Sequence, residues 1–287
     1  MELEAISGAA TVALTSTVVF LLVAKTWNVV SRSIGSSPSF SDRIMHEAAQ
    51  RFRDELDRLS SSQSTYLSGA LVFVVLYIAA YTLQAKHLFV GYPSWQLYSF
   101  LGFLLLVLCY AAYRLARTVL ARYEMKFLRD ANVAIGHQLQ QLSVGGTRIF
   151  HDVATSAGIV DHVIIGQKGL YAVNVVARRT AKRANARLRG NSIEYSNSKV
   201  ESPIVDIAAK TARLQKEFRE LLGHKVRVRS VIAVPGWEIG EQSNDEHLLV
   251  NERTIAMVGG WNDTNDHLMN EDVEILKNEL LSRCARG

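Results

Sequence analysis

The stretch IFHDVATSAGIVDHVIIGQKGLYAVNVV, residues 149–176, decides the fold of this chain. It contains two runs rich in β-branched and aromatic residues, 160–165 and 170–176, which are separated by Gly166-Gln167-Lys168-Gly169. This pattern predicts an antiparallel β-hairpin with a tight turn. Because both faces of both runs are mostly apolar, we expect the hairpin to be covered on both sides.

Two polar side chains lie within this apolar hairpin, the carboxylate of Asp161 and the amide of Asn174. Burying a polar group costs free energy unless another group binds it. Successive side chains on a strand alternate between faces, so residues 174 and 176 share one face, beside Asp161 on the other strand. Asp161 and Asn174 are therefore the first candidates for a site, with Asp161 as the candidate metal ligand.

The same stretch resembles the nuclease-related domain (NERD) family, a branch of the restriction-endonuclease-like fold. The resemblance rests on residues 151–153 (HDV), 159–166 (IVDHVIIG) and 169–173 (GLYAV), and covers about residues 129–237. In the family, the aspartate matched by Asp161 is followed by Glu-x-Lys on the adjacent strand, and an upstream helix carries Gly-Glu. Here those positions hold Asn174, Val176 and Gly136-His137. The resemblance thus implies the family scaffold without most of its chemistry.

The missing groups matter for catalysis. A pair of carboxylates holds a hard divalent cation such as Mg²⁺, which activates water, and the lysine orients the attack or neutralises charge. Asn174 brings no charge and Val176 brings no polar group, so we expect no cleavage and no cofactor. One alternative stays open. Asp206 stands where the family usually has glutamine, and Asp161, Asp206 and His137 together form a relocated site for Mg²⁺ or Mn²⁺.

A basic segment, residues 177–189 (ARRTAKRANARLR), directly follows the hairpin. Its cations predict binding to the phosphates of DNA or RNA without sequence preference. Attraction to anionic lipid headgroups and a merely solvated loop are the competing interpretations. The candidate binding residues are Arg178, Arg179, Lys182, Arg183, Arg187 and Arg189.

Three apolar runs of membrane-spanning length, residues 5–24, 66–83 and 95–115, account for much of the 48% apolar content. Lys and Arg concentrate in residues 25–65 and after residue 113, so the positive-inside rule predicts an external N-terminus and a cytoplasmic C-terminal domain at a bacterial inner membrane. The two cysteines, Cys109 and Cys284, are far apart and indicate neither a disulfide framework nor a metal site.

The predicted fold class is therefore a membrane-anchored α/β protein: three transmembrane helices followed by a restriction-endonuclease-like α/β sandwich. Residues 1–27 are the first span, 28–65 a cytoplasmic amphipathic helix and linker, 66–116 a transmembrane hairpin, and 117–287 the nuclease-related domain. Within that domain we expect strands at 147–153, 190–196, 226–234, 248–250 and 254–258, a helix at 203–222 that ends at Gly223, and a last helix at 270–284.

We expect a membrane-tethered nuclease-related protein that has lost cleavage and binds nucleic acid or a protein partner at the cytoplasmic face of the lipid bilayer. Two alternatives stay open: an active metal-dependent nuclease with relocated ligands, and a membrane scaffold in which the domain serves assembly, including homo-oligomers.

Overall fold

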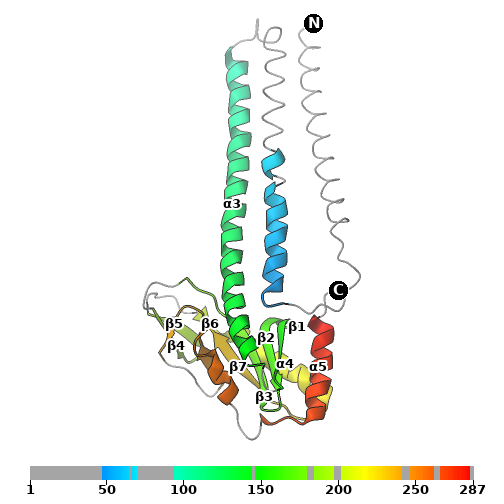
Figure 1. Cartoon of the computed structure of the whole chain (residues 1–287). Coiled ribbons are helices and arrows are strands. Elements are labelled where there is room, and N and C mark those ends of the chain that lie inside the picture. The colour runs from blue at the N-terminus through cyan, green and yellow to red at the C-terminus, as the bar shows by residue number, and fades with distance from the viewer. Residues whose placement is uncertain are drawn as a thin grey trace. The chain divides into compact units, whose positions relative to one another are not determined.

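The computed structural model of the chain describes residues 47–64, 66–69, 94–143, 146–179, 184–196, 202–240, 246–261 and 266–284 (Figure 1). The chain divides into two compact units. Met1–Pro38 and Glu55–Glu124 form the first, and Ser39–Asp54 and Met125–Gly287 form the second.

The first unit is helical in its described part. Its residues 55–64 and 66–69 are helical, and α3 (Ser94–Gln141) contributes its first part to this unit. Two arginines of α3 join these helices: Arg114 Nη2 donates to the Tyr66 hydroxyl at 2.9 Å, and Arg122 donates to the side-chain carbonyl of Gln63.

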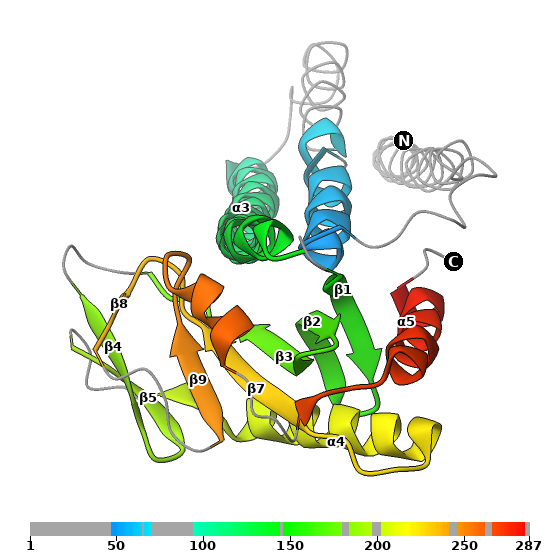
Figure 2. The same cartoon turned by 60° about the horizontal axis from the view of Figure 1, so that its bottom comes forward.

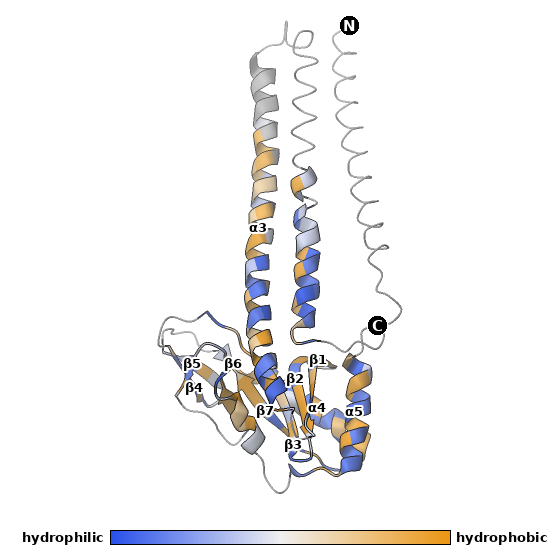
Figure 3. Cartoon of the chain, viewed as in Figure 1, coloured by the Kyte–Doolittle hydropathy of each residue, from blue (hydrophilic) through white to orange (hydrophobic). Residues whose placement is uncertain are grey.

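The predicted membrane anchor is wrong. Among the residues that the structure describes, no helix combines the length and the apolar character needed to cross a bilayer. The predicted third span, 95–115, is one part of the 48-residue α3, whose later turns carry many charged side chains (Figure 3). The predicted first span lies outside the described residues, and so does most of the second. The fold class with three transmembrane helices, and the inner-membrane localisation and orientation derived from it, are corrected accordingly.

A five-stranded mixed sheet forms the centre of the second unit, in the order β1-β2-β3-β7-β9. Its strands are β1 (Arg148–Thr155), β2 (Gly158–Gly166), β3 (Gly169–Val175), β7 (Val228–Ala233) and β9 (His247–Val250). The first three are antiparallel, and β3, β7 and β9 are parallel. The predicted hairpin is confirmed, because Gly166 pairs with Gly169 across a two-residue turn.

Helices cover both faces of this sheet, as the two-sided apolar pattern of β2 and β3 predicts. Helices α4 (Val205–Leu222) and α5 (Asn270–Cys284) pack on one face, where Phe218 and Leu280 join the strand side chains in one core cluster (Figure 2). On the other face, Ile135 of α3 packs with residues of β2, β3, β7 and β9 and of the 3₁₀ helix η2 (Ile255–Gly260). Cys284, at the end of α5, is fully buried in the first cluster.

A smaller sheet, ordered β6-β5-β4-β8, follows β3 in the chain. Its strands are β4 (Asn185–Arg189), β5 (Ser192–Tyr195), β6 (Ser202–Pro203) and β8 (Glu238–Ile239). Strand β5 falls within the predicted strand 190–196. Strand β4, which lies inside the basic segment, was not predicted. Its apolar side chains, Ala186 and Leu188, belong to a core cluster that includes the buried Trp237.

The predicted helices of the domain are confirmed, and one predicted strand is wrong. Helix α4 ends where Gly223 adopts a left-handed conformation (φ 73°) and donates its N–H to the Arg219 carbonyl. Residues 254–258 were predicted as a strand but lie in η2. The reason is local: the side chain of Asn251 accepts hydrogen bonds from the backbone N–H groups of Arg253 and Thr254, both at 2.9 Å, which turns the chain.

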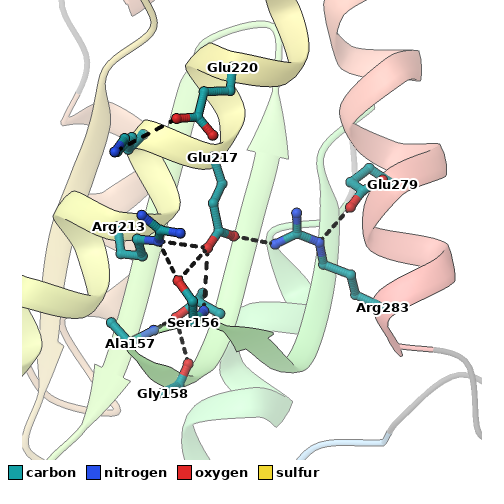
Figure 4. A network of polar contacts seen from close by, with 10 residues as sticks. Ser156, Ala157, Gly158, Arg213, Glu217, Glu220, Glu279 and Arg283 are labelled. Carbon is teal, nitrogen blue, oxygen red and sulfur yellow. Dashed lines mark hydrogen bonds and ion pairs between the residues drawn. The ribbon is translucent and has the colours of Figure 1, made fainter.

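One carboxylate, that of Glu217 on α4, ties the β1–β2 turn to both helices (Figure 4). It accepts hydrogen bonds from the N–H and hydroxyl of Ser156 at 3.3 and 3.1 Å, from Arg213 Nε at 3.2 Å, and from Arg283 of α5 at 2.5 Å. Burial opposes ionisation of Glu217, but Arg283 and the Ser156 N–H hold its pKa below the ordinary value. The network therefore stabilises the helical face opposite η2.

Candidate functional site

Two carboxylates meet on the neighbouring strands β1 and β2. The ladder pairs His151 with His162 and Val153 with Val160, and Asp152 and Asp161 occupy the step between these pairs. Both aspartates are buried, with exposed fractions of 5% and 6%. Asp152 departs from strand geometry, with φ at 51°, a value that residues other than glycine rarely adopt.

A guanidinium from far along the sequence binds both carboxylates. Arg51 Nη2 is ion-paired with Asp161 Oδ1, and Arg51 Nε lies 3.5 Å from Asp152 Oδ1. The backbone N–H of Arg51 also donates to Asp152 Oδ2 at 3.2 Å. Arg51 lies in the segment Ser39–Asp54, which belongs to the same compact unit as the sheet.

The second oxygen of Asp161 is bound by the backbone. Asp161 Oδ2 accepts the N–H of Val175 at 2.7 Å, so the carboxylate joins β2 to the end of β3. Burial raises the pKa of Asp161 above its ordinary value, whereas Arg51 and the Val175 N–H lower it. The negative charge of Asp161 therefore depends on Arg51.

The paired histidines beside the aspartates are buried and neutral. The Nδ1 atoms of His151 and His162 are 2.7 Å apart, so one ring donates and the other accepts. Burial lowers the pKa of His151 to about 4. Burial, His151 and Arg51 hold the pKa of His162 well below 6.5. Neither ring can act as a cationic ligand for phosphate at neutral pH.

Asn174 and Val176 take the places of the family's glutamate and lysine, and neither supplies their chemistry. The last β2–β3 pair joins His162 to Val173, so the register places Asn174 opposite Asp161 one step further on. Asn174 is buried, and its Nδ2 has no hydrogen-bond partner among the described residues. The side chain of Val176 packs against the apolar cluster around Trp237.

The relocated metal site predicted from Asp161, Asp206 and His137 is not assembled by any contact in the described part of the chain. Asp206, in the first turn of α4, and His137 on α3 are both exposed, whereas Asp161 is buried. The described residues contain no group of three or more His, Cys, Asp or Glu side chains able to hold a metal ion.

Of the six candidate binding residues in the basic segment, four are described by the structure. Lys182 and Arg183 lie outside the described residues. Arg178 and Arg179 follow the end of β3; the guanidinium of Arg178 lies 4.4 Å from the centre of the Tyr195 ring and that of Arg179 lies 5.8 Å from the centre of the Phe127 ring. Arg187 and Arg189 project from the exposed face of β4.

Both arginines of β4 share one carboxylate. Glu194 on β5 is 2.6 Å from Arg187 Nη2 and 2.8 Å from Arg189 Nη1, and hydrogen bonds from Arg189 and Arg187 hold its pKa below the ordinary value. The side chains of Arg187 and Arg189 remain 61% and 75% exposed. Because both side chains are exposed, an anion in solvent can reach the two guanidinium groups.

Sequence reasoning missed Arg51 and the pairing of Asp152 with Asp161. A hairpin turn at Ser156-Ala157 gives the missing register, because it sets histidine opposite histidine and aspartate opposite aspartate. No local pattern marks Arg51, whose contact with Asp161 joins residues 110 positions apart.

The domain is thus an α/β fold in which two paired strands carry buried carboxylates bound by Arg51. Residues 129–235 match the model of the NERD family, described as the nuclease-related domain. This confirms the resemblance over those residues, which are less than half of the chain.

Comparison with curated proteins gives no match. Among solved structures, the chain is similar to SfsA of Pyrococcus furiosus, solved in complex with Ca²⁺, at 15% sequence identity and a TM-score of 0.22. That similarity covers 53% of this chain and 52% of the SfsA chain. At that score it carries no argument about this protein.

Proposed function

We propose that residues 129–235 form a nucleic-acid-binding domain that has lost metal-dependent cleavage. The match to the nuclease-related domain supports a function connected with nucleic acid. The observation that carries the proposal is the set of four described arginines that follows β3 in the chain: Arg178 and Arg179 in the segment after that strand, and Arg187 and Arg189 on β4.

These arginines, called the basic edge from here on, suit a phosphate backbone better than base recognition. A backbone offers a row of anions at regular spacing, and arginine binds phosphate in a bidentate manner. Glu194 neutralises one charge and orients Arg187 and Arg189, so a phosphate binds guanidinium groups that are already held in place. Such binding depends strongly on salt and little on sequence.

The loss of cleavage follows from the groups around Asp161. Arg51 already binds Asp161, and Asn174 and Val176 bring neither charge nor a proton acceptor. Arginine stays protonated at any physiological pH and cannot accept a proton from water. The Nδ1 atoms of His151 and His162 bind each other, and burial lowers the pKa of both rings, which makes them weak proton acceptors.

The proposal is tested by fluorescence anisotropy with a short labelled duplex across a series of salt concentrations. We expect Arg187→Ala/Arg189→Ala to weaken binding and to reduce the slope of log K against log salt by about 1–2. Lys216→Ala/Lys277→Ala is the matched control, because it also removes two cations that are each paired with one glutamate. Equal slopes for both double variants and the parent would refute a phosphate contact at the basic edge.

The lost-cleavage part has its own test. The parent protein is incubated with supercoiled plasmid and Mg²⁺ or Mn²⁺, and we expect no nicking above a buffer control. Nicking that disappears in Asp161→Ala would establish an active nuclease. Retention on anionic vesicles together with failure to bind the duplex would instead assign the basic edge to lipid headgroups.

A further inference from the structure

The two buried aspartates hold a cation that belongs to the chain itself. We propose that Arg51, carried by residues 47–54, is the resident cation of the Asp152–Asp161 pair and keeps a divalent metal ion out of it. This inference does not rest on nucleic-acid binding, since the basic edge lies on other elements.

Three contacts from one residue reach both carboxylates. The guanidinium is ion-paired with Asp161 Oδ1, its Nε lies 3.5 Å from Asp152 Oδ1, and the backbone N–H of Arg51 donates to Asp152 Oδ2. Residues 50–64 are helical, so this N–H belongs to the first turn of a helix, where partial positive charge gathers. Asp152 therefore caps that helix from a distant strand. The two negative charges are met by one guanidinium and one helix end.

Backbone strain marks both sides of the contact. Ala49 and Asp152 are the two residues other than glycine with positive φ in the described part of the chain, at 65° and 51°. Such conformations cost energy and persist where the surroundings determine them. One lies two residues before Arg51 and the other binds it. Both strained residues flank the Arg51–Asp152 contact, which indicates that the surrounding structure holds this contact in place.

A glycine makes the close approach of this segment geometrically allowed. A Cβ atom placed on Gly136 of α3 would lie 2.5 Å from the Cβ of Ala48 and 3.5 Å from His162 Cε1. Any larger residue would push residues 47–51 away from the sheet. Gly136 thus positions Arg51 without touching either carboxylate.

The same oxygens that hold Arg51 would be needed by a metal ion. Mg²⁺ and Mn²⁺ bind carboxylate oxygens directly, and Mg²⁺ does so at about 2.0–2.1 Å. The guanidinium, ion-paired with one carboxylate and close to the other, already supplies positive charge to the oxygens that such an ion would bind. The oxygen of Asp161 that faces away is bound by the Val175 N–H.

The test measures Mn²⁺ binding through the thermal midpoint of the full chain. The parent and Asp161→Asn should respond to Mn²⁺ alike, because Mn²⁺ does not bind at Asp161 in the parent. Arg51→Met removes the charge and keeps an apolar stem, so Mn²⁺ at ten times its Kd should raise the midpoint by about 3–5 °C. Arg51→Met/Asp161→Asn should lose that response. Arg53→Met, which removes an exposed arginine paired with Glu47, is the matched control and should behave as the parent.

The proposal would be overturned by a Mn²⁺ shift in the parent that Asp161→Asn abolishes, or by no shift in a folded Arg51→Met. Should Arg51→Met not fold, the triple variant Arg51→Met/Asp152→Asn/Asp161→Asn decides. It removes the guanidinium and both buried carboxylate charges, so it should fold if these three groups act as a unit. A triple variant that also fails to fold would show that Arg51 is needed for a reason other than the two carboxylates and would overturn the proposal. Duplex binding by the folded variants separates this outcome from failure of the proposed function.

Discussion

The buried pair His151–His162 makes the stability of this protein depend on pH in the range where most proteins are insensitive. Both rings are neutral in the folded protein, and both bind a proton near pH 6.5 once unfolded. Because the folded pKa values are lowered, the unfolded chain binds more protons as the pH falls below 6.5. Stability is therefore complete above pH 6.5 and is lost towards the folded pKa values.

The size of this loss of stability follows from the lowered pKa of His151. A change from 6.5 to about 4 corresponds to a total loss of about 3 kcal/mol once the pH lies below both values. About 2 kcal/mol of this is lost between pH 7 and pH 5. His162 is more deeply buried and adds to the loss in the same direction. Against a typical stability of about 5–15 kcal/mol, the effect is large.

Urea unfolding at pH 7, 6 and 5 measures this dependence. The variant His151→Phe/His162→Phe removes both titrating groups and keeps two buried rings, so its stability should change much less over that interval. His247 is also buried with a lowered pKa and stays in both proteins, so the difference between them isolates the pair. His137→Asn is the control, because His137 is exposed and its replacement should leave the profile unchanged.

A parent protein whose unfolding free energy is constant from pH 7 to pH 5 would refute the reasoning. So would a double variant with the same pH slope as the parent. NMR titration of the histidine Cε1–H resonances gives an independent check, since two of them should stay unshifted in that range.

Three further predictions concern stability. Glu217→Gln should cost about 1–3 kcal/mol in urea unfolding, against less than about 0.5 kcal/mol for the exposed Glu220→Gln. Burial raises the pKa of Glu217, but Arg283 outweighs burial and keeps this pKa below 4.5. The stability that the Glu217 carboxylate contributes is therefore present above pH 4.5 and should fade as the pH falls through the folded pKa. Acid unfolding at a higher pH in the parent than in Glu217→Gln would contradict this. Phe218→Ala should cost about 3–5 kcal/mol, because the ring is fully buried between α4 and the sheet, and a smaller loss would show that the core collapses around the gap. Gly223→Ala should cost about 1 kcal/mol, because φ is 73° there, and an unchanged midpoint would mean that the helix end rearranges.

The elements that could be predicted from sequence are those whose signals are local. The hairpin of β2 and β3 follows from two apolar runs around a glycine-bounded turn, and α4 follows from helical periodicity with a glycine at its end. Strand β4 carried an equally local signal, the alternation of Ala186 and Leu188 with arginines. This segment was interpreted as a binding segment because of its arginines, and its strand alternation was not recognised.

The candidate site could be predicted only in part, because it is assembled from distant segments. Asp161 and Asn174 stand out as polar residues in apolar strands, and both are buried as expected. Arg51 reaches Asp161 from a helix, and no local sequence pattern marks that contact. The partner of Asp161 is therefore set by tertiary packing, which periodicity and spacing do not encode.

The burial of Cys284 gives the chain a built-in reporter of its last helix. Burial raises the pKa of that thiol to about 12, so the nucleophilic thiolate is scarcely populated at neutral pH. Cys109 is exposed, and no third cysteine complicates the chemistry. A maleimide should therefore modify Cys109 promptly and Cys284 only when α5 detaches from the sheet. The ratio of the two rates would follow opening of that helix without any engineered probe.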